Sequence, residues 1–218
     1  MIRHPSFITE PWCVRETSFD IDVLAQSESV FALSNGHLGL RGNLDEGEPH
    51  GLPGTYLNSV YELRPLPSAE PAYGLPEVAQ TTVNVTNGKI IRLLVDDELF
   101  DLREGELVAH ERMLDLRAGV LRRSVDWRSP AGARVTLRTT RLVSLTQRAA
   151  AAISWEVTAV GQPVGIVVES ELVANEEMPA SDPDPRVGPT MTGVLEAVEH
   201  GPADRDAALL MHRITSSG

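Results

Sequence analysis

The sequence of 218 residues is poor in cysteine, lysine and aromatic residues. Cys13 is its only cysteine, so the chain can form neither an internal disulfide nor a cysteine-based metal cluster. Lys89 is its only lysine; the 19 basic residues are outnumbered by 31 acidic ones, and the formal net charge is −12. Because a nucleic-acid-binding protein needs a positive surface for phosphates, this charge argues against that class.

Long hydrophobic runs are also missing. No apolar stretch approaches the length of a bilayer span, which argues against a membrane protein. The segment Met1 to Trp12 has no apolar signal core and no small-residue cleavage site, so secretion is not indicated. The histidines are dispersed without metal-ligand spacing, and we expect no metal. These features favour a cytoplasmic protein.

Alternation of apolar and polar residues is what the sequence has in abundance. In Val120 to Arg128, Leu121, Arg123, Val125 and Trp127 fall on one face, which is typical of a β-strand. A turn at residues 129–132 leads into a second run, and the two runs predict an antiparallel hairpin. Helix signals are scarce. Further strands are expected at Trp12 to Glu16, Leu57 to Leu63, Val78 to Val85, Lys89 to Val95, Ala133 to Leu145, Val164 to Val173 and Ala207 to Ile214.

This pattern predicts an all-β fold, a large antiparallel β-sandwich with few or no helices. Residues 64–77 are rich in proline and residues 176–189 lack periodicity, so both are expected to be long loops. The last predicted strand is followed by no closing element. We therefore expect residues 1–218 to be one domain of a longer chain.

A glycine-rich segment draws attention near the N-terminus. Gly36, Gly39 and Gly42 fall within seven residues, beside Arg41, whose guanidinium suits a carboxylate or a phosphate. No strand-then-helix context follows, so this is not a dinucleotide-binding fingerprint. A pair of strands joined by tight glycine turns is the favoured explanation of the segment from these residues alone.

The same segment opens a longer resemblance. The chain resembles the N-terminal domain of glycoside hydrolase family 65, the maltose, trehalose and kojibiose phosphorylases and their hydrolase relatives. The resemblance is carried, in order, by Asn35 to Asn43, Glu46-Gly47, Pro53 to Glu62, Val83-Asn84-Val85, Ile91-Arg92-Leu93, Phe100-Asp101-Leu102, Arg112 to Leu121, Trp127 to Gly132, Arg141 to Leu145 and Glu156-Val157-Thr158. It covers most of the chain.

The resemblance implies an architecture and a division of labour. In this family a β-sandwich precedes a linker, an (α/α)6 barrel and a small C-terminal β-domain, and the chemistry belongs to the barrel. A barrel glutamate acts as general acid, and inorganic phosphate, a co-substrate rather than a cofactor, attacks the anomeric carbon of an α-linked glucose disaccharide. The barrel is absent from residues 1–218, so we expect no catalytic residue here and a partner in the chain's own barrel.

The titratable residues also indicate that residues 1–218 contain no catalytic site. An inverting reaction on a sugar needs a carboxylic acid of raised pKa in a water-excluding pocket. The acidic residues lie in polar runs that predict solvated side chains: Glu46, Glu48, Asp96, Asp97, Glu176 and Glu177. His110 is expected at the surface or an edge of a strand, and His37 is expected to pack rather than to transfer protons.

The residues suited to hold sugar hydroxyls at a pocket edge are Asn35, Arg41, Asn43 and Tyr56. An alternative of equal weight is that Arg41 and Asn43 only attach the loop to the sandwich through hydrogen bonds. Trp127 and Trp155 are expected in the core. At the level of the whole domain, the alternatives are an autonomous carbohydrate-binding module or an interaction domain without catalysis. A homodimer through an exposed sheet face is a further possibility.

Overall fold

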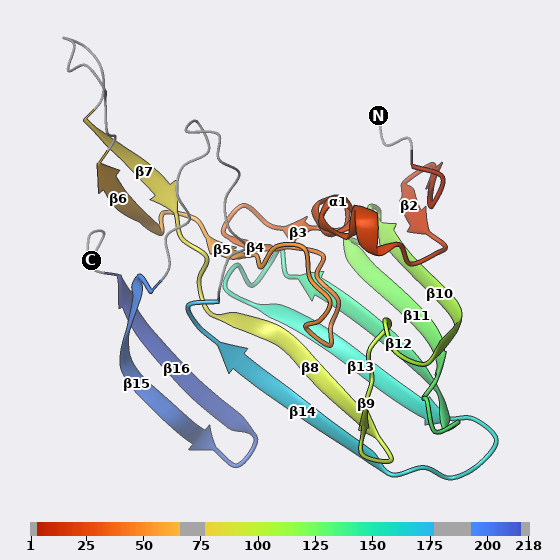
Figure 1. Cartoon of the computed structure of the whole chain (residues 1–218). Helices are drawn as coiled ribbons and strands as arrows, with labels where there is room; N and C mark the ends of the chain where they lie inside the picture. The colour runs from red at the N-terminus through yellow and green to blue at the C-terminus, as the bar shows by residue number, and fades with distance from the viewer. Residues whose placement is uncertain (1–3, 66–76, 177–192, 215–218) are drawn as a thin grey trace.

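The computed structural model describes residues 4–65, 77–176 and 193–214 (Figure 1). These residues form antiparallel β-structure with a single α-helix, α1 (Leu24–Val30), preceded by a 3-10 turn at Ile21–Val23. None of the described helices is long and apolar enough to span a bilayer. The strands are β1 (Phe7–Glu10), β2 (Cys13–Glu16), β3 (Leu33–Ser34), β4 (Leu38–Leu40), β5 (Thr55–Leu57), β6 (Tyr61–Pro65), β7 (Val78–Thr82), β8 (Asn87–Val95), β9 (Glu98–Leu99), β10 (Glu106–Asp115), β11 (Val120–Arg128), β12 (Arg134–Val143), β13 (Ala151–Ala159), β14 (Ile166–Val173), β15 (Leu195–Asp204) and β16 (Ala207–Ile214).

The largest sheet contains six strands in the order β1-β2-β10-β11-β12-β13, all antiparallel. Its central hairpin, β11–β12, pairs Val120 with Leu142 at one end and Arg128 with Arg134 at the other. Gly132 closes the turn at a φ of +98°, a conformation that favours glycine. The hairpin predicted from the sequence is therefore confirmed.

A smaller sheet, in the order β14-β8-β9, lies across β12 and β13 of the large sheet (Figure 1). β8 turns Leu93 and Val95 inward, where they pack with Val125 and Trp127 of β11. Two antiparallel layers with an apolar interior form a β-sandwich. The all-β sandwich predicted from the alternation is confirmed.

Shorter elements surround the two layers. The three-stranded sheet β3-β4-β5 and α1 lie along one end of the large sheet, while the hairpins β6–β7 and β15–β16 stand beside the body (Figure 1). β3 and β4 contact β12. This placement brings residues 33–57, which contain the glycine-rich segment, against the inner face of the large sheet.

The interior contains two separate apolar clusters. The larger one is built from Leu44, Leu93, Val95, Phe100, Leu102, Val125, Trp127, Ala133, Val135 and Leu137. The smaller one is built from Phe31, Leu33, Leu38, Leu40, Leu114, Leu121 and Val143. Trp127 is fully buried, and its indole Nε1 donates to the carbonyl of Glu104 over 2.8 Å. The core position predicted for Trp127 is therefore confirmed, whereas Trp155 is half-buried and packs against the larger cluster from its edge.

Most predicted strands coincide with observed ones, with one error. The strand predicted from Leu57 to Leu63 is wrong: β5 ends at Leu57 and β6 begins at Tyr61. Between them Ser59 adopts a φ of +70°, and the backbone N–H of Asn58 donates to the carbonyl of His37 over 2.7 Å. The chain therefore turns inside an apolar run. The loops predicted at 64–77 and 176–189 lie largely outside the described residues.

The larger cluster makes a prediction about stability. Leu137 is 1% exposed and Leu145 is 78% exposed, so the same Leu→Ala substitution tests burial alone. We expect Leu137→Ala to lower the free energy of unfolding by about 2–5 kcal/mol and Leu145→Ala by no more than about 0.5 kcal/mol. Urea denaturation of both variants measures the difference. Equal losses would contradict the assignment of the core.

Candidate functional site

The inner face of the large sheet carries charge as well as apolar groups. Six charged side chains, each no more than 4% exposed, form a buried layer that we call the ionic layer: Glu16, Asp45, Glu46, Arg112, Arg123 and Arg141. Three are cations and three are anions. Because an isolated charge is costly to bury, a layer of this kind persists only when its members neutralise one another.

Strand alternation places the three arginines. Arg112 lies opposite Arg123 in the β10–β11 pair, and Arg123 lies opposite Thr139 in the β11–β12 pair. Arg141 follows two residues after Thr139 and so shares its face. Along β11 the inward residues run from Leu121 in the smaller cluster through Arg123 to the larger cluster. The ionic layer therefore separates the two apolar clusters.

Each arginine has a carboxylate partner. Arg112 Nε lies 2.6 Å from Glu16 Oε2. Arg123 binds both oxygens of Glu46, at 2.5 and 2.7 Å, in the bidentate geometry that favours arginine. Arg141 pairs with Asp45, whose second oxygen accepts from the hydroxyl of Thr139 over 2.7 Å. Glu46 was expected to be solvated; it is 3% exposed, and that expectation is wrong because Arg123 draws it inward.

The same arginines hold the backbone of the glycine-rich segment. Arg112 Nη1 donates to the carbonyl of Gly42 over 2.9 Å. Arg141 donates to the carbonyl of Arg41 over 3.2 Å and to that of Asn43 over 3.1 Å. Gly42 packs so closely that a Cβ atom would lie 2.6 Å from that of Phe31, so no larger residue fits. Residues 41–46 are thus fixed to the sheet.

The pKa directions of two carboxylates in the layer, Glu16 and Asp45, favour their ionised forms. Burial alone would raise the pKa of Glu16, but the hydrogen bond from His110 and the charge of Arg112 lower it to about 2. Burial likewise opposes ionisation of Asp45, and the charges of Arg141 and Arg123 lower its pKa below the usual value. A general acid requires a raised pKa instead. The ionic layer is therefore a structural cluster and not a catalytic carboxylate pair.

His110 belongs beside this layer. It is 7% exposed, and its Nε2 donates to Glu16 over 3.2 Å, so its expected place at the surface or strand edge is wrong. His110 precedes Arg112 by two residues on β10, so both side chains point to the inner face of the sheet. Burial lowers the pKa of His110 to about 4, against the opposing hydrogen bond with Glu16. The ring is neutral at physiological pH.

The other predicted acidic residues behave differently from Glu46. Glu48, Asp96 and Asp97 are exposed, as expected. Glu176 is half-buried and accepts from Asn84 Nδ2 over 3.3 Å and from Asn87 Nδ2 over 2.8 Å. Glu177 lies outside the described residues. The described members of this group, Glu48, Asp96, Asp97 and Glu176, do not join the ionic layer.

Three of the four predicted substrate-proximal residues bind within the chain. Asn35 Nδ2 donates to the carbonyls of Ser144 and Arg148, and its Oδ1 accepts from the N–H groups of residues 37 and 38. Arg41 reaches α1, donating to the carbonyl of Ala25 over 2.5 Å. Asn43 Nδ2 donates to the carbonyl of Leu52 over 2.8 Å. Their partners lie in different elements, so these three do not converge on one site.

Tyr56 is the fourth, and it has a different position. It is half-buried and lines a groove of about 550 Å³ between β4–β5 and the hairpin β6–β7. His37 is half-buried and lines the same groove. Of the predicted residues, Tyr56 therefore faces a space large enough for a small molecule.

Lys89 is a buried residue that sequence reasoning missed. It is 3% exposed and borders a cavity of about 300 Å³ between β8 and β13. Its ammonium donates to the carbonyl of Gly54 over 3.3 Å, to Thr55 Oγ1 over 2.7 Å and to Asn87 Oδ1 over 2.8 Å. Burial lowers its pKa to about 7. Because three acceptors occupy its three hydrogens, it holds the chain before β5 and does not offer an anion site.

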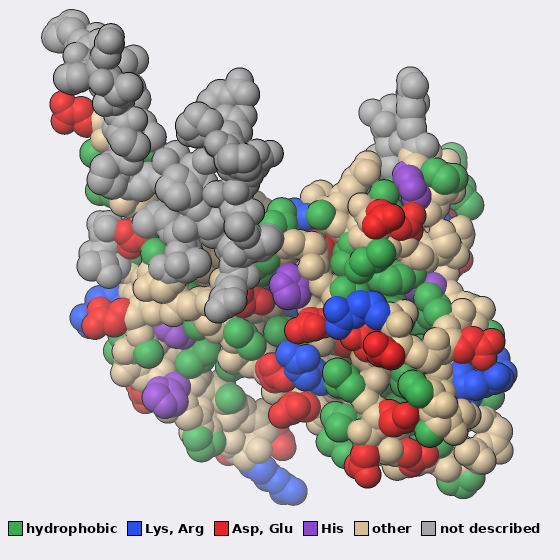
Figure 2. Space-filling model, in the orientation of Figure 1, with side chains coloured by type: hydrophobic (Ala, Val, Ile, Leu, Met, Phe, Trp, Pro, Cys, Tyr) green, Lys and Arg blue, Asp and Glu red, His purple; other side chains and the backbone are tan. Residues whose placement is uncertain are grey.

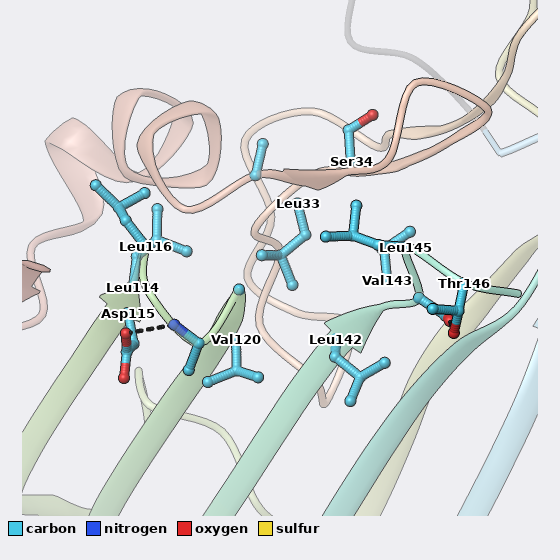
Figure 3. Close-up of a pocket in the computed structure, with 14 residues that line it drawn as sticks. Leu33, Ser34, Leu114, Asp115, Leu116, Val120, Leu142, Val143, Leu145 and Thr146 are labelled. Atoms are coloured by element: carbon cyan, nitrogen blue, oxygen red, sulfur yellow. Dashed lines mark hydrogen bonds between the residues drawn. The ribbon is translucent and has the colours of Figure 1, made fainter. Parts of the chain in front are cut away.

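A second hollow, of about 370 Å³, lies where β10, β11 and β12 end near β3 (Figure 3). Leu33, Leu114 and Val143 line it, and its one carboxylate is that of Asp115. Asp115 accepts from the backbone N–H groups of residues 117 and 118, and these bonds, with that from Arg122, lower its pKa. The hollow is mainly apolar.

In the part of the chain that the structure describes, no group of three or more His, Cys, Asp or Glu side chains could hold a metal ion.

The fold and these sites define a β-sandwich domain whose buried charges serve structure. Comparison with known proteins gives the family. The profile described as "Glycosyl hydrolase family 65, N-terminal domain" matches residues 14–218. The chain therefore belongs to this family and contains its N-terminal domain.

Individual relatives extend this result. The chain is 61% identical over its whole length to an uncharacterized glycosyl hydrolase of Mycobacterium tuberculosis, of which it covers 28%. It is 36% identical to an alpha,alpha-trehalose phosphorylase of Thermoanaerobacter brockii, over 90% of this chain and 26% of that protein. A solved structure of a putative kojibiose phosphorylase from the human microbiome matches 70% of this chain and 20% of that one, with 32% identity and a TM-score of 0.62. The chain thus spans little more than a quarter of the curated relatives.

The ionic layer predicts that the free energy of unfolding depends strongly on the pairing of its buried charges. Arg123→Met leaves the carboxylate of Glu46 buried without its bidentate partner, and we expect a loss of about 3–5 kcal/mol in the free energy of unfolding. Glu46→Leu added to Arg123→Met should recover much of that loss, because no unpaired charge then remains. The control is Arg134→Met, which breaks the ion pair between Arg134 and Asp126. The side chain of Arg134 is 33% exposed, so this substitution should lower the free energy of unfolding by no more than about 1 kcal/mol. Additive losses in the double variant, measured in urea, would refute the coupling.

The shifted pKa values predict how stability depends on pH. His110 has a pKa of about 4 in the folded chain against an ordinary value of 6.5, so below pH 6.5 the unfolded chain binds more protons. Stability therefore falls as pH drops from about 6.5 to about 4, by up to about 1.4 kcal/mol per pH unit. Glu16, with a pKa of about 2 against 4.5, extends the fall below pH 4.5.

The substitution His110→Gln separates the two contributions. A glutamine amide can still donate to Glu16 but does not titrate, so the slope between pH 6.5 and 4.5 should flatten while the fall below pH 4.5 remains. Urea midpoints measured at half-unit pH steps give both slopes. An unchanged slope above pH 4.5 would show that His110 is not the group responsible.

Proposed function

We propose that the chain forms the N-terminal part of a longer cytoplasmic enzyme that cleaves an α-linked glucose disaccharide, by phosphorolysis with inorganic phosphate as co-substrate or by hydrolysis. The observation that carries this proposal is the 36% identity to a trehalose phosphorylase over 90% of the chain. The lone Cys13, which forms no disulfide, supports a reducing compartment. The remaining three quarters of the relatives' length would contain the catalytic machinery.

The partner proposed for this domain is the catalytic part of the same longer chain, an (α/α)6 barrel. Support comes from apolar side chains that β14, β15 and β16 leave exposed: Val167 at 54%, Val168 at 50%, Leu172 at 45%, Val198 at 48% and Met211 at 44%. Figure 2 shows hydrophobic side chains scattered among charges in the region of these strands. Apolar side chains left exposed on neighbouring strands are suited to contact with another protein surface.

We propose for the segment from Asn35 to Tyr61 a supporting role beside the substrate. Asn35, Arg41 and Asn43 would act by shaping and stiffening the loop, since each of them donates to a main-chain carbonyl. Tyr56 is the member whose side chain faces an open groove. In this proposal the domain lends a rigid edge to the active site and supplies no reacting group.

An activity assay tests the proposed function. Full-length protein and the 218-residue chain are each incubated with maltose, trehalose or kojibiose, with and without phosphate, and released glucose and glucose 1-phosphate are measured. We expect turnover by the full-length protein alone, and the need for phosphate identifies a phosphorylase. Turnover by the 218-residue chain would overturn its non-catalytic assignment. Failure of the full-length protein on all three sugars would overturn the proposed substrate class.

A further inference from the structure

The groove that contains Tyr56 combines aromatic and polar side chains. We call it the tyrosine groove and define it by the side chains that line it: His37, Tyr56, Asn58, Tyr61, Gln80 and Thr82. Its volume of about 550 Å³ falls within the range of small-molecule sites. It is open to solvent, because Asn58, Gln80 and Thr82 are exposed.

Strand pairing brings the groove residues together from two elements. Tyr61 lies directly opposite Thr82 in the β6–β7 hairpin, and Gln80 is two residues before Thr82, so the three share one face. On the other side, Gly39 lies opposite Tyr56 in the β4–β5 pair. Because Gly39 has no side chain, the tyrosine has no cross-strand neighbour to cover it.

The groove side chains differ from the rest of the segment in their hydrogen bonding. Among the residues that the structure describes, none bonds to the side chains of His37, Tyr56, Asn58, Tyr61, Gln80 or Thr82. By contrast, Asn35, Arg41 and Asn43 each donate to main-chain carbonyls. Free hydroxyl, amide and imidazole groups therefore converge on one space.

The composition of the lining restricts the ligand. Among the described residues that line the groove there is no Lys, Arg, Asp or Glu, so these residues offer no counter-charge for a phosphate ester or an acidic peptide. Tyrosine rings present flat apolar faces, while amides and hydroxyls donate and accept hydrogen bonds in the same small volume. A pyranose ring has matching apolar faces and a rim of hydroxyl groups.

We propose that the tyrosine groove binds a sugar ring of a neutral saccharide, with Tyr56 and Tyr61 contacting the ring and Asn58, Gln80 and Thr82 bonding its hydroxyls. The choice of an α-glucoside rests on the proposed function; the neutral saccharide itself rests on the groove. Since the described lining contains no carboxylic acid that could protonate a leaving group, we assign the groove a binding role rather than a catalytic one.

Titration calorimetry on the full-length protein tests the proposal. The probes are thio-linked analogues of maltose, trehalose and kojibiose, whose sulfur bridge resists cleavage. Tyr56→Ala and Gln80→Ala should each weaken binding of at least one analogue by about fivefold to tenfold, or remove one bound saccharide per chain. Gln147→Ala, which changes an exposed glutamine on the β12–β13 loop, is the matched control and should bind as the wild type.

Each outcome has a distinct meaning. Because Gln80 is exposed, Gln80→Ala should keep the melting temperature of the wild type, so weaker binding reports the groove and not unfolding. Wild-type affinity in both groove variants, or equal weakening in Gln147→Ala, would overturn the proposal. Saccharide binding without turnover of any disaccharide would overturn the proposed function and leave the groove standing.

Discussion

The pairing of three buried arginines with three buried carboxylates is the constraint on which the rest of the structure depends. Arg112, Arg123 and Arg141 lie on adjacent strands of the large sheet, where an all-apolar face would otherwise have formed one continuous core. Their charges can be buried only if anions from elsewhere reach them. Those anions come from β2 and from residues 45–46, so the sheet cannot close without the segment that follows β4.

This requirement links stability to function. The arginines bind carbonyls of residues 41–43 as well as carboxylates, which holds this segment flat against the sheet. Lys89 adds a further attachment at residues 54 and 55, directly before Tyr56. A loop fixed at both ends can present a groove without the entropic cost of ordering it on binding. Under the proposed saccharide site, the domain would act as a rigid support for the sugar rather than as a source of reacting groups.

The sequence predicts the strands and their faces well because alternation is a local property. Arg123 is predicted on the face of Val125 and Trp127, and the structure places it there. The burial of Glu46 and His110 could not be predicted, since their partners Arg123 and Glu16 are 77 and 94 residues away in the chain. Tyr56 was singled out from its loop, whereas Gln80 was missed because it joins the groove only through the pairing of β6 with β7. An arginine at an inward position of a strand is the signal that points to a buried anion.

Hydrogen–deuterium exchange of the full-length protein tests most directly whether the ionic layer fixes the segment after β4. The backbone N–H of Arg41 donates to the carbonyl of Gly54 over 2.9 Å, and that of Gly42 donates to the carbonyl of Glu28 over 2.8 Å. Peptides covering these residues should exchange as slowly as those from β11 and β12, and Arg123→Met should accelerate them. Exchange as fast as that of the exposed β12–β13 loop in the wild-type protein would contradict the claim that buried ion pairs hold this segment to the sheet.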